Sequence, residues 1–279
     1  MSKRFILPLA VLAAAGAVVA ALTLRPGASL ASDFEARLAD LSPGAEGAPL
    51  AESDIAHLPV PVQRYLRRAG ALGKTPVTMV HVAFEATLYS GPGTPGMSGP
   101  AHQIDVLDPP RRLFFMTTRM RGLPVAVLHD YRPEEASMRA RAARLADVVN
   151  VSGADLARTE TVTFLNDICV FAPSALIRPE FEWTPIDNTR SGVTFTAGPH
   201  TVSATLIFDA EGDLVNFASE DRGELQPDGS LRIQRWTTPL SAYQDFDGRR
   251  LPTYGEAIWH RPEGPFTYGT FEVRSVTFH

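Results

Sequence analysis

Residues 77–89 read VTMVHVAFEATLY, and apolar and polar side chains alternate along this stretch with a period of two. Such alternation is typical of a β-strand that buries one face. The same pattern returns in shorter runs up to residue 131 and dominates the chain after Pro179. Acid- and glycine-containing segments at 209–213 and 226–230 interrupt it, and such segments favour hairpin turns. Strands therefore decide the fold of this chain.

The predicted strands fall into two groups. In the first half they cover residues 77–89, 102–107, 112–118 and 123–131, and in the second half 182–187, 192–196, 200–208, 214–221, 231–238, 249–260 and 266–278. The stretch 91–100, GPGTPGMSGP, is predicted to be a loop or hairpin tip, because its prolines and glycines suit neither regular element. Residues 139–149 are rich in alanine and arginine and leave the choice of element open.

Helical periodicity occurs in two places. After Pro61, apolar residues recur at helical spacing up to Ala69, and Gly70 is a natural C-cap, which predicts one short amphipathic helix. Helical spacing also runs from Ala154 to Ile177, where Pro173 is expected to divide the helix into two pieces.

The order of these elements defines the expected fold class. Strands and helices do not alternate, which argues against a doubly wound parallel sheet. We therefore predict one α+β domain over residues 53–279: a long curved antiparallel sheet, resembling half a barrel, with a few short helices packed on one face. A sheet that curls around its apolar side chains either encloses a cavity or is plugged by a helix.

The N-terminus differs from the rest of the chain. Lys3 and Arg4 precede an uncharged apolar stretch at residues 5–24, which as a helix would be about 30 Å long and could cross a bilayer. The preceding basic residues predict that the bulk of the chain is extracytoplasmic, that is periplasmic, and held at the inner membrane by residues 5–24. Cleaved export is the alternative, because residues 29–31 form a small-x-small signal peptidase site.

This reading divides the chain into three parts: an anchor or signal segment at residues 1–25, a linker at 26–52 and the folded domain. The linker is rich in alanine, glycine, proline, serine and acids, with one short amphipathic run at Phe34, Leu38 and Leu41.

Composition excludes several functions. The 279 residues carry a net charge of −5, so nothing favours nucleic acid as a partner.

The residues that most often carry chemistry show no motif. Cys169, the one cysteine, lies in the apolar context DICVF and is predicted to be a small buried side chain. The seven histidines are scattered, with His129-Asp130 the best local candidate, and show no zinc-type spacing. No nucleophile elbow or phosphate-binding glycine motif occurs, and we predict neither a metal nor a cofactor.

Three stretches resemble a known family: LPVPVQRYL at residues 58–66, LIFDAEG at 206–212 and LPTYGEAIW at 251–259. Together they are similar to an uncharacterised bacterial family that places a hydrophobic N-terminal segment before one soluble domain. The resemblance covers about residues 55–279 and departs at 91–100. It implies membrane association, but the family has no established activity, so no catalytic residue is implied.

The candidate ligand-binding residues come from the aromatic strands near the C-terminus and from one charged strand end. Strand alternation puts Glu220 and Arg222 on the same side of the strand end. If that side faces inward, the charged pair must either be satisfied by hydrogen bonds or belong to a site, because burying a lone charge is costly. We predict that the curved sheet binds or carries a hydrophobic or lipid-like molecule; the candidates are Trp183, Trp236, Tyr243, Tyr254, Trp259, Glu220 and Arg222.

Two other functional classes stay open. One is a hydrolase or isomerase whose dispersed polar groups converge only in three dimensions; its candidates are Glu220, Asp221, Arg222, Glu256 and His260. The other is a structural or partner-binding envelope protein. The observation that tests ligand binding is whether the concave face of the sheet is an open apolar pocket or is filled by its own side chains. Strand alternation alone does not decide between the two.

Overall fold

A computed structural model describes residues 29–279, so the predicted anchor or signal stretch at 5–24 lies outside the described residues. Within residues 29–279, no helix combines the length and apolar character needed to cross a membrane.

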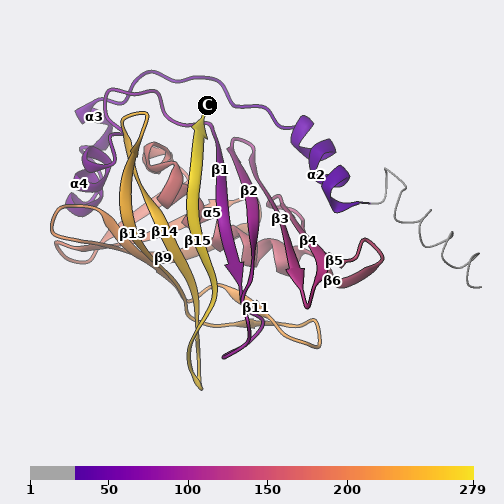
Figure 1. Ribbon diagram of the computed structural model, residues 1–279. Coiled ribbons are helices and arrows are strands. Elements are labelled where there is room, and N and C mark those ends of the chain that lie inside the picture. Colours follow the sequence, from indigo (N-terminus) through magenta and orange to yellow (C-terminus); the bar gives the residue numbers. More distant parts are fainter. Residues whose placement is uncertain (1–28) are drawn as a thin grey trace, which may run out of the picture.

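One 13-stranded antiparallel sheet forms the body of the protein (Figure 1). Its strands follow the spatial order β6-β5-β4-β3-β2-β1-β15-β14-β13-β10-β9-β8-β7, so β1 pairs with β15, the last strand of the chain. The strands are β1 Met79–Leu88, β2 Met97–Leu107, β3 Pro110–Met120, β4 Leu123–Tyr131, β5 Ala136–Ala142, β6 Ala146–Gly153, β7 Phe181–Pro185, β8 Arg190–Ala197, β9 His200–Phe208, β10 Leu214–Ser219, β13 Trp236–Phe246, β14 Arg249–Arg261 and β15 Gly264–Phe278. A separate small hairpin joins β11 Gly223–Leu225 to β12 Leu231–Ile233.

The sheet curls around one central helix, α5, which spans Ala154–Phe171 (Figure 1). This helix contacts β5 and β6 at one end of the sheet and β9 and β10 towards the other, which requires the sheet to curve. Nearly every residue of α5 is buried. The 3-10 helix η2, Pro173–Ile177, follows directly, so the predicted division of the helix at Pro173 is confirmed. The predicted curved antiparallel sheet is likewise confirmed.

Strand β2 begins earlier than the sequence suggests, since Met97–Pro100 belong to the strand and not to the preceding loop. Gly99 is required there, because an added Cβ would lie 2.0 Å from the carbonyl oxygen of Thr117 on β3. The ladder to β3 starts only at Ala101, which suits a proline at position 100. The ambiguous residues 139–149 form parts of β5 and β6 and the turn between them.

The predicted linker at residues 26–52 contains a helix at the N-terminal end of the described chain. Helix α2, Leu30–Ala39, buries Leu30 and Phe34 against the face of the sheet opposite α5, where the ring of Phe34 stacks on Phe115 at 4.8 Å between centroids. Arg37 pairs with Asp130 on β4. Much of the segment is therefore docked on the sheet, and the helices cover both faces instead of one. In the sequence, the run at Phe34, Leu38 and Leu41 is too short to outweigh the loop-like composition on either side.

Two further helices lie between α2 and the sheet in sequence: α3, Glu52–Ile55, and α4, Val60–Arg68. Helix α4 packs Val62, Tyr65 and Leu66 into the main core, and its C-cap is Ala69, one residue before the predicted Gly70. Gly70 itself has φ +68° and reverses the chain after the helix.

Substituting Gly70 by alanine is expected to destabilise the protein by about 3 kcal/mol, because a Cβ there combines positive-φ strain with an approach of 2.3 Å to the carbonyl oxygen of Gly248. Gly73 is a matched control, since its φ is +74° but an added Cβ meets nothing within 4 Å. Gly73→Ala should cost only about 1 kcal/mol. Urea unfolding of the two variants measures the difference, and equal losses would contradict the packing argument.

Candidate functional site

The concave face of the sheet is not fully filled by α5. A cavity of about 470 Å³ lies between the helix and the strands. Its apolar lining comes from both halves of the sheet and from α5, and includes Phe84, Leu88, Met97, Phe114, Val127, Met138, Val170, Phe171, Leu240 and Phe271. Val148 also lines it and is 51% exposed, so the cavity reaches the protein surface beside β6.

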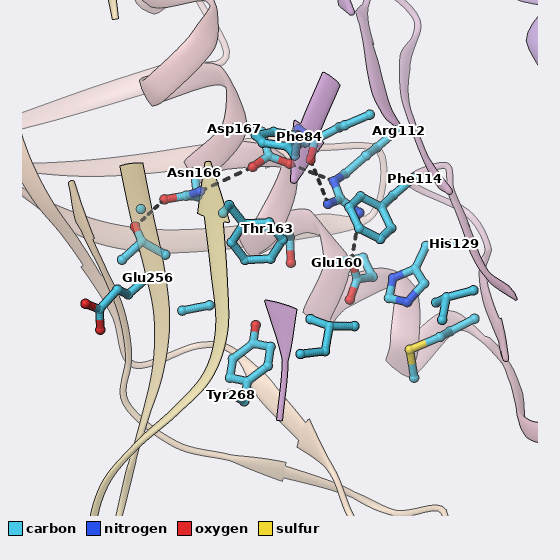
Figure 2. Close-up of a pocket in the computed structure, with 18 of the residues that line it drawn as sticks. Phe84, Arg112, Phe114, His129, Glu160, Thr163, Asn166, Asp167, Glu256 and Tyr268 are labelled. Atoms are coloured by element: carbon cyan, nitrogen blue, oxygen red, sulfur yellow. Dashed lines mark hydrogen bonds and ion pairs between the residues drawn. The ribbon is translucent and has the colours of Figure 1, made fainter. Parts of the chain in front are cut away.

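One end of the cavity carries a buried polar network centred on Arg112 of β3 (Figure 2). The guanidinium Nε donates to Asp167 Oδ2 at 2.6 Å, and Nη2 donates to Gln103 Oε1 at 3.1 Å. Nη1 lies 3.7 Å from Glu160 Oε2. Asn166 extends the network, because its amide donates to Asp167 and its Oδ1 accepts from Thr238. Three strands and α5 are thereby tied together around one cation.

A second cation, Arg222, borders the same end. Its Nε donates to Thr163 Oγ1 and its Nη1 to the Tyr268 hydroxyl, both at 3.0 Å. Its guanidinium lies 4.4 Å from the ring centre of Trp236 and 5.0 Å from that of Trp259, a cation–π arrangement. Nη2 is 3.5 Å from Glu160 Oε1, so Glu160 stands between the two arginines.

The surroundings shift the pKa values of several groups at this end. Burial raises the pKa of Asp167, and the attraction of Arg112 opposes that shift. Burial, together with the nearby Asp167, raises the pKa of Asp105 well above its ordinary value. Burial also opposes ionisation of Glu160, but the attraction of Arg222, His129 and Arg112 holds its pKa below the ordinary value. Burial lowers the pKa of His129 to about 4, with Arg112 and Arg222 acting in the same direction and Glu160 opposing them.

Some predicted ligand-binding residues do meet at the cavity. Arg222, Trp236 and Tyr254 line it. Trp259 does not line the cavity, but its ring stacks on that of the lining residue Tyr268 at 5.5 Å between centroids. The β13–β14 register puts Trp236 opposite Trp259 and so brings these two aromatics together.

The other candidates lie elsewhere. Trp183 on β7 donates its indole N–H to the carbonyl of Leu176, away from the cavity. Tyr243 lies farther along β13, under the guanidinium of Arg250. Glu220 is exposed and pairs with Arg235, so the predicted pairing of Glu220 with Arg222 on one side is wrong. Strand β10 ends at Ser219, and the alternation on which that prediction rested does not extend through the turn that follows.

The polar groups of the enzyme alternative are not brought together. Asp221 pairs with Arg158 and accepts from Ser203, and the ring of His260 is hydrogen-bonded to Thr237. Glu256 and Arg222 line the cavity, but Glu256 is held by Tyr254 and Thr267 rather than by Arg222.

The α5 side of the site is not among the residues that the sequence predicts. Glu160, Asn166 and Asp167 are buried polar residues on α5, and Arg112 is a buried cation just before the apolar run of β3. A charged residue at a position predicted to be buried indicates a partner or a site, because a buried charge must be paired. This was the signal in the sequence that could have identified these residues. His129 was noted as a candidate, and it does line the cavity.

Two other groups of interest lie away from the cavity. Cys169 is buried as predicted, burial raises the pKa of its thiol, and its carbonyl accepts from the Tyr65 hydroxyl at 2.7 Å. His81 and His102 contact each other at 3.2 Å between ring nitrogens on β1 and β2. Residues 29–279 contain no cluster of three or more histidine, cysteine or acidic side chains suited to a metal.

Several solved structures show low similarity to this chain. A DUF1329 family protein from Desulfovibrio piger is 12% identical, with 79% of this chain and 93% of that chain covered and a TM-score of 0.42. A putative outer membrane lipoprotein-sorting protein domain from Vibrio parahaemolyticus is 11% identical, with coverage of 72% and 85% and a TM-score of 0.40. A LolA superfamily protein from Nitrosomonas europaea is 10% identical, with coverage of 78% and 93% and a TM-score of 0.40.

Curated proteins contain no match to this sequence. A family model, in contrast, matches residues 48–271, which include all three stretches that carried the resemblance noted in the sequence. The match begins before α3 and ends within β15, so it includes all the other strands of the sheet and nearly all residues that line the cavity. The chain therefore belongs to the family of unknown function DUF6544.

Proposed function

We propose that this protein binds a single small amphiphilic or lipid-like molecule in the cavity under α5. The observation that carries the proposal is a mainly apolar cavity of about 470 Å³ with a buried network of charged groups, Arg112, Glu160 and Arg222, at one end. Pockets that hold one small molecule commonly measure about 300–1,000 Å³ and combine an apolar wall with a few polar groups. The cavity suits one apolar chain or ring system with a polar end.

The packing of the core supports a cavity that is occupied by a ligand. Protein interiors are close-packed, so a large apolar space forfeits dispersion contacts unless a ligand occupies it. The opening at Val148 gives a ligand a route to the surface. We further propose that the domain works outside the cytoplasm beside the membrane, on the sequence prediction for residues 5–24.

The direct test is to purify the full-length chain in amphipol, extract it with organic solvent and analyse the extract by mass spectrometry. A stoichiometric amphiphile is expected. In parallel, the neutral fluorophore N-phenyl-1-naphthylamine should brighten on entering the cavity. Absence of both a co-purified molecule and probe binding would contradict the proposed function.

A matched pair of variants locates the binding. Thr118 lines the cavity, whereas its neighbour Thr117 is exposed on the opposite face of β3. Thr118→Phe is expected to weaken probe binding at least about tenfold, or about 1.4 kcal/mol, because the ring occupies the space of the probe. Thr117→Phe should bind like the unaltered protein. Equal effects would place the probe outside this cavity.

A further inference from the structure

We infer that the polar end of the ligand is an uncharged hydroxyl group, as in a long-chain alcohol or an acylglycerol, held at Glu160 between Arg112 and Arg222. The inference rests on the proposed function, since it names the chemical class of the molecule bound in the same cavity. The geometry around Glu160 and the balance of charge at this end of the cavity carry it.

Glu160 has an acceptor atom to spare. The residue lines the cavity and is only 5% exposed, yet its Oε2 has no hydrogen-bond partner. The nearest guanidinium nitrogens, Nη1 of Arg112 at 3.7 Å from Oε2 and Nη2 of Arg222 at 3.5 Å from Oε1, make long ion-pair contacts. A buried carboxylate oxygen without a donor is costly, so a ligand N–H or O–H aimed at it gains free energy.

The arginines offer the complementary donors. Arg112 uses Nε and Nη2 for Asp167 and Gln103, and Arg222 uses Nε and Nη1 for Thr163 and Tyr268. The remaining terminal nitrogen of each guanidinium is the one that faces Glu160. A hydroxyl fits this arrangement because it both donates and accepts, giving its proton to Glu160 Oε2 and accepting from a neighbouring guanidinium.

The charge balance at this end of the cavity favours a hydroxyl head group over a carboxylate or an ammonium. The two guanidinium groups are matched by the two carboxylates of Glu160 and Asp167. Burial raises the pKa of Asp167, but the 2.6 Å hydrogen bond from Arg112 Nε favours its ionised form. The third carboxyl, Asp105, is 1% exposed and its raised pKa favours the neutral form, while the lowered pKa of His129 keeps its ring neutral at pH 7. A charged ligand would add an unmatched charge to a buried site, which is costly.

The test compares three ligands of equal chain length, dodecanol, dodecanoate and dodecylammonium, as competitors of N-phenyl-1-naphthylamine on the full-length protein at about pH 8, where the two charged heads are ionised. Dodecanol is expected to bind at least about tenfold more tightly than either charged ligand, a difference of about 1.4 kcal/mol. Tightest binding of dodecanoate or dodecylammonium, or equal binding of all three, would overturn the inference while leaving the proposed function standing. If the probe itself does not bind, the proposed function fails.

Substituting Glu160 supplies a second, independent measurement. Glu160→Gln removes one negative charge, so the site gains a net positive charge and dodecanoate should improve relative to dodecanol by at least about tenfold. Glu256→Gln is the control, because Glu256 also lines the cavity but pairs with Tyr254 and Thr267 instead of an arginine. It should leave the order of the three ligands unchanged. An unchanged order in Glu160→Gln would contradict the role assigned to Glu160; if that variant does not fold, the comparison on the unaltered protein decides.

Discussion

Replacing Arg112 by methionine is expected to lower the free energy of unfolding by about 3–5 kcal/mol, the range measured when one partner of a buried ion pair is removed. The guanidinium is 7% exposed and bonds Asp167 at 2.6 Å and Gln103 at 3.1 Å. Without it, Asp167 keeps only the Asn166 amide as a donor in a buried environment. Chemical unfolding monitored by circular dichroism measures the loss.

Arg111→Met is the matched control, since the neighbouring residue points to the opposite face of β3 and pairs with Asp130 at 3.4 Å. Asp130 retains its second partner Arg37 in that variant, so a loss of about 1 kcal/mol is expected. Adding Asp167→Leu to Arg112→Met should restore part of the lost stability, because the uncompensated carboxylate is gone. Equal losses in the Arg111 and Arg112 variants would show that burial of the network does not govern its energy.

The fold could be predicted largely from local pattern. Period-two alternation identified most strands, and Pro173 correctly divided the helix at 154–177. The start of β2 and helix α2 are not predicted from local pattern, because both depend on tertiary contacts. Gly99 and Pro100 look like loop residues in isolation, and only the 2.0 Å approach of the Thr117 carbonyl explains a glycine inside β2. Helix α2 likewise depends on a tertiary surface, the apolar outer face of β3 and β4, that no local pattern reveals.

The site was less predictable because it is assembled across the sheet. The aromatic half, Trp236 and Trp259, sits on neighbouring strands and follows from alternation and register. The polar half joins Arg112 on β3 to Glu160 on α5 and Arg222 after β10, which are far apart in sequence. Of these three charges the sequence indicated only Arg222 as a candidate, because their convergence depends on how strongly the sheet curls around α5.

Acidification from pH 7 to pH 4 is expected to destabilise the protein through His129. Burial lowers the pKa of its imidazole to about 4, against about 6.5 in an unfolded chain. Between these values the unfolded state binds the additional proton, so the stability associated with neutral His129 is present above about pH 6.5 and is lost as the pH falls towards 4. The contribution amounts to about 3 kcal/mol. Glu160 attracts the proton, but Arg112 and Arg222 also face the ring and oppose it.

His129→Gln isolates this contribution, because glutamine does not titrate. The free energy of unfolding of the unaltered protein should fall by about 3 kcal/mol more than that of His129→Gln between pH 7 and pH 4, and other titrating groups cancel in the comparison. Asp105 is among them: its raised pKa acts in the opposite direction, favouring the folded state at acid pH in both proteins. Parallel stability curves for the two proteins would mean that His129 is solvated in the cavity. A midpoint near pH 4 in the NMR titration of its ring would agree with the expected loss, because both measurements depend on the same desolvation beside Arg112 and Arg222.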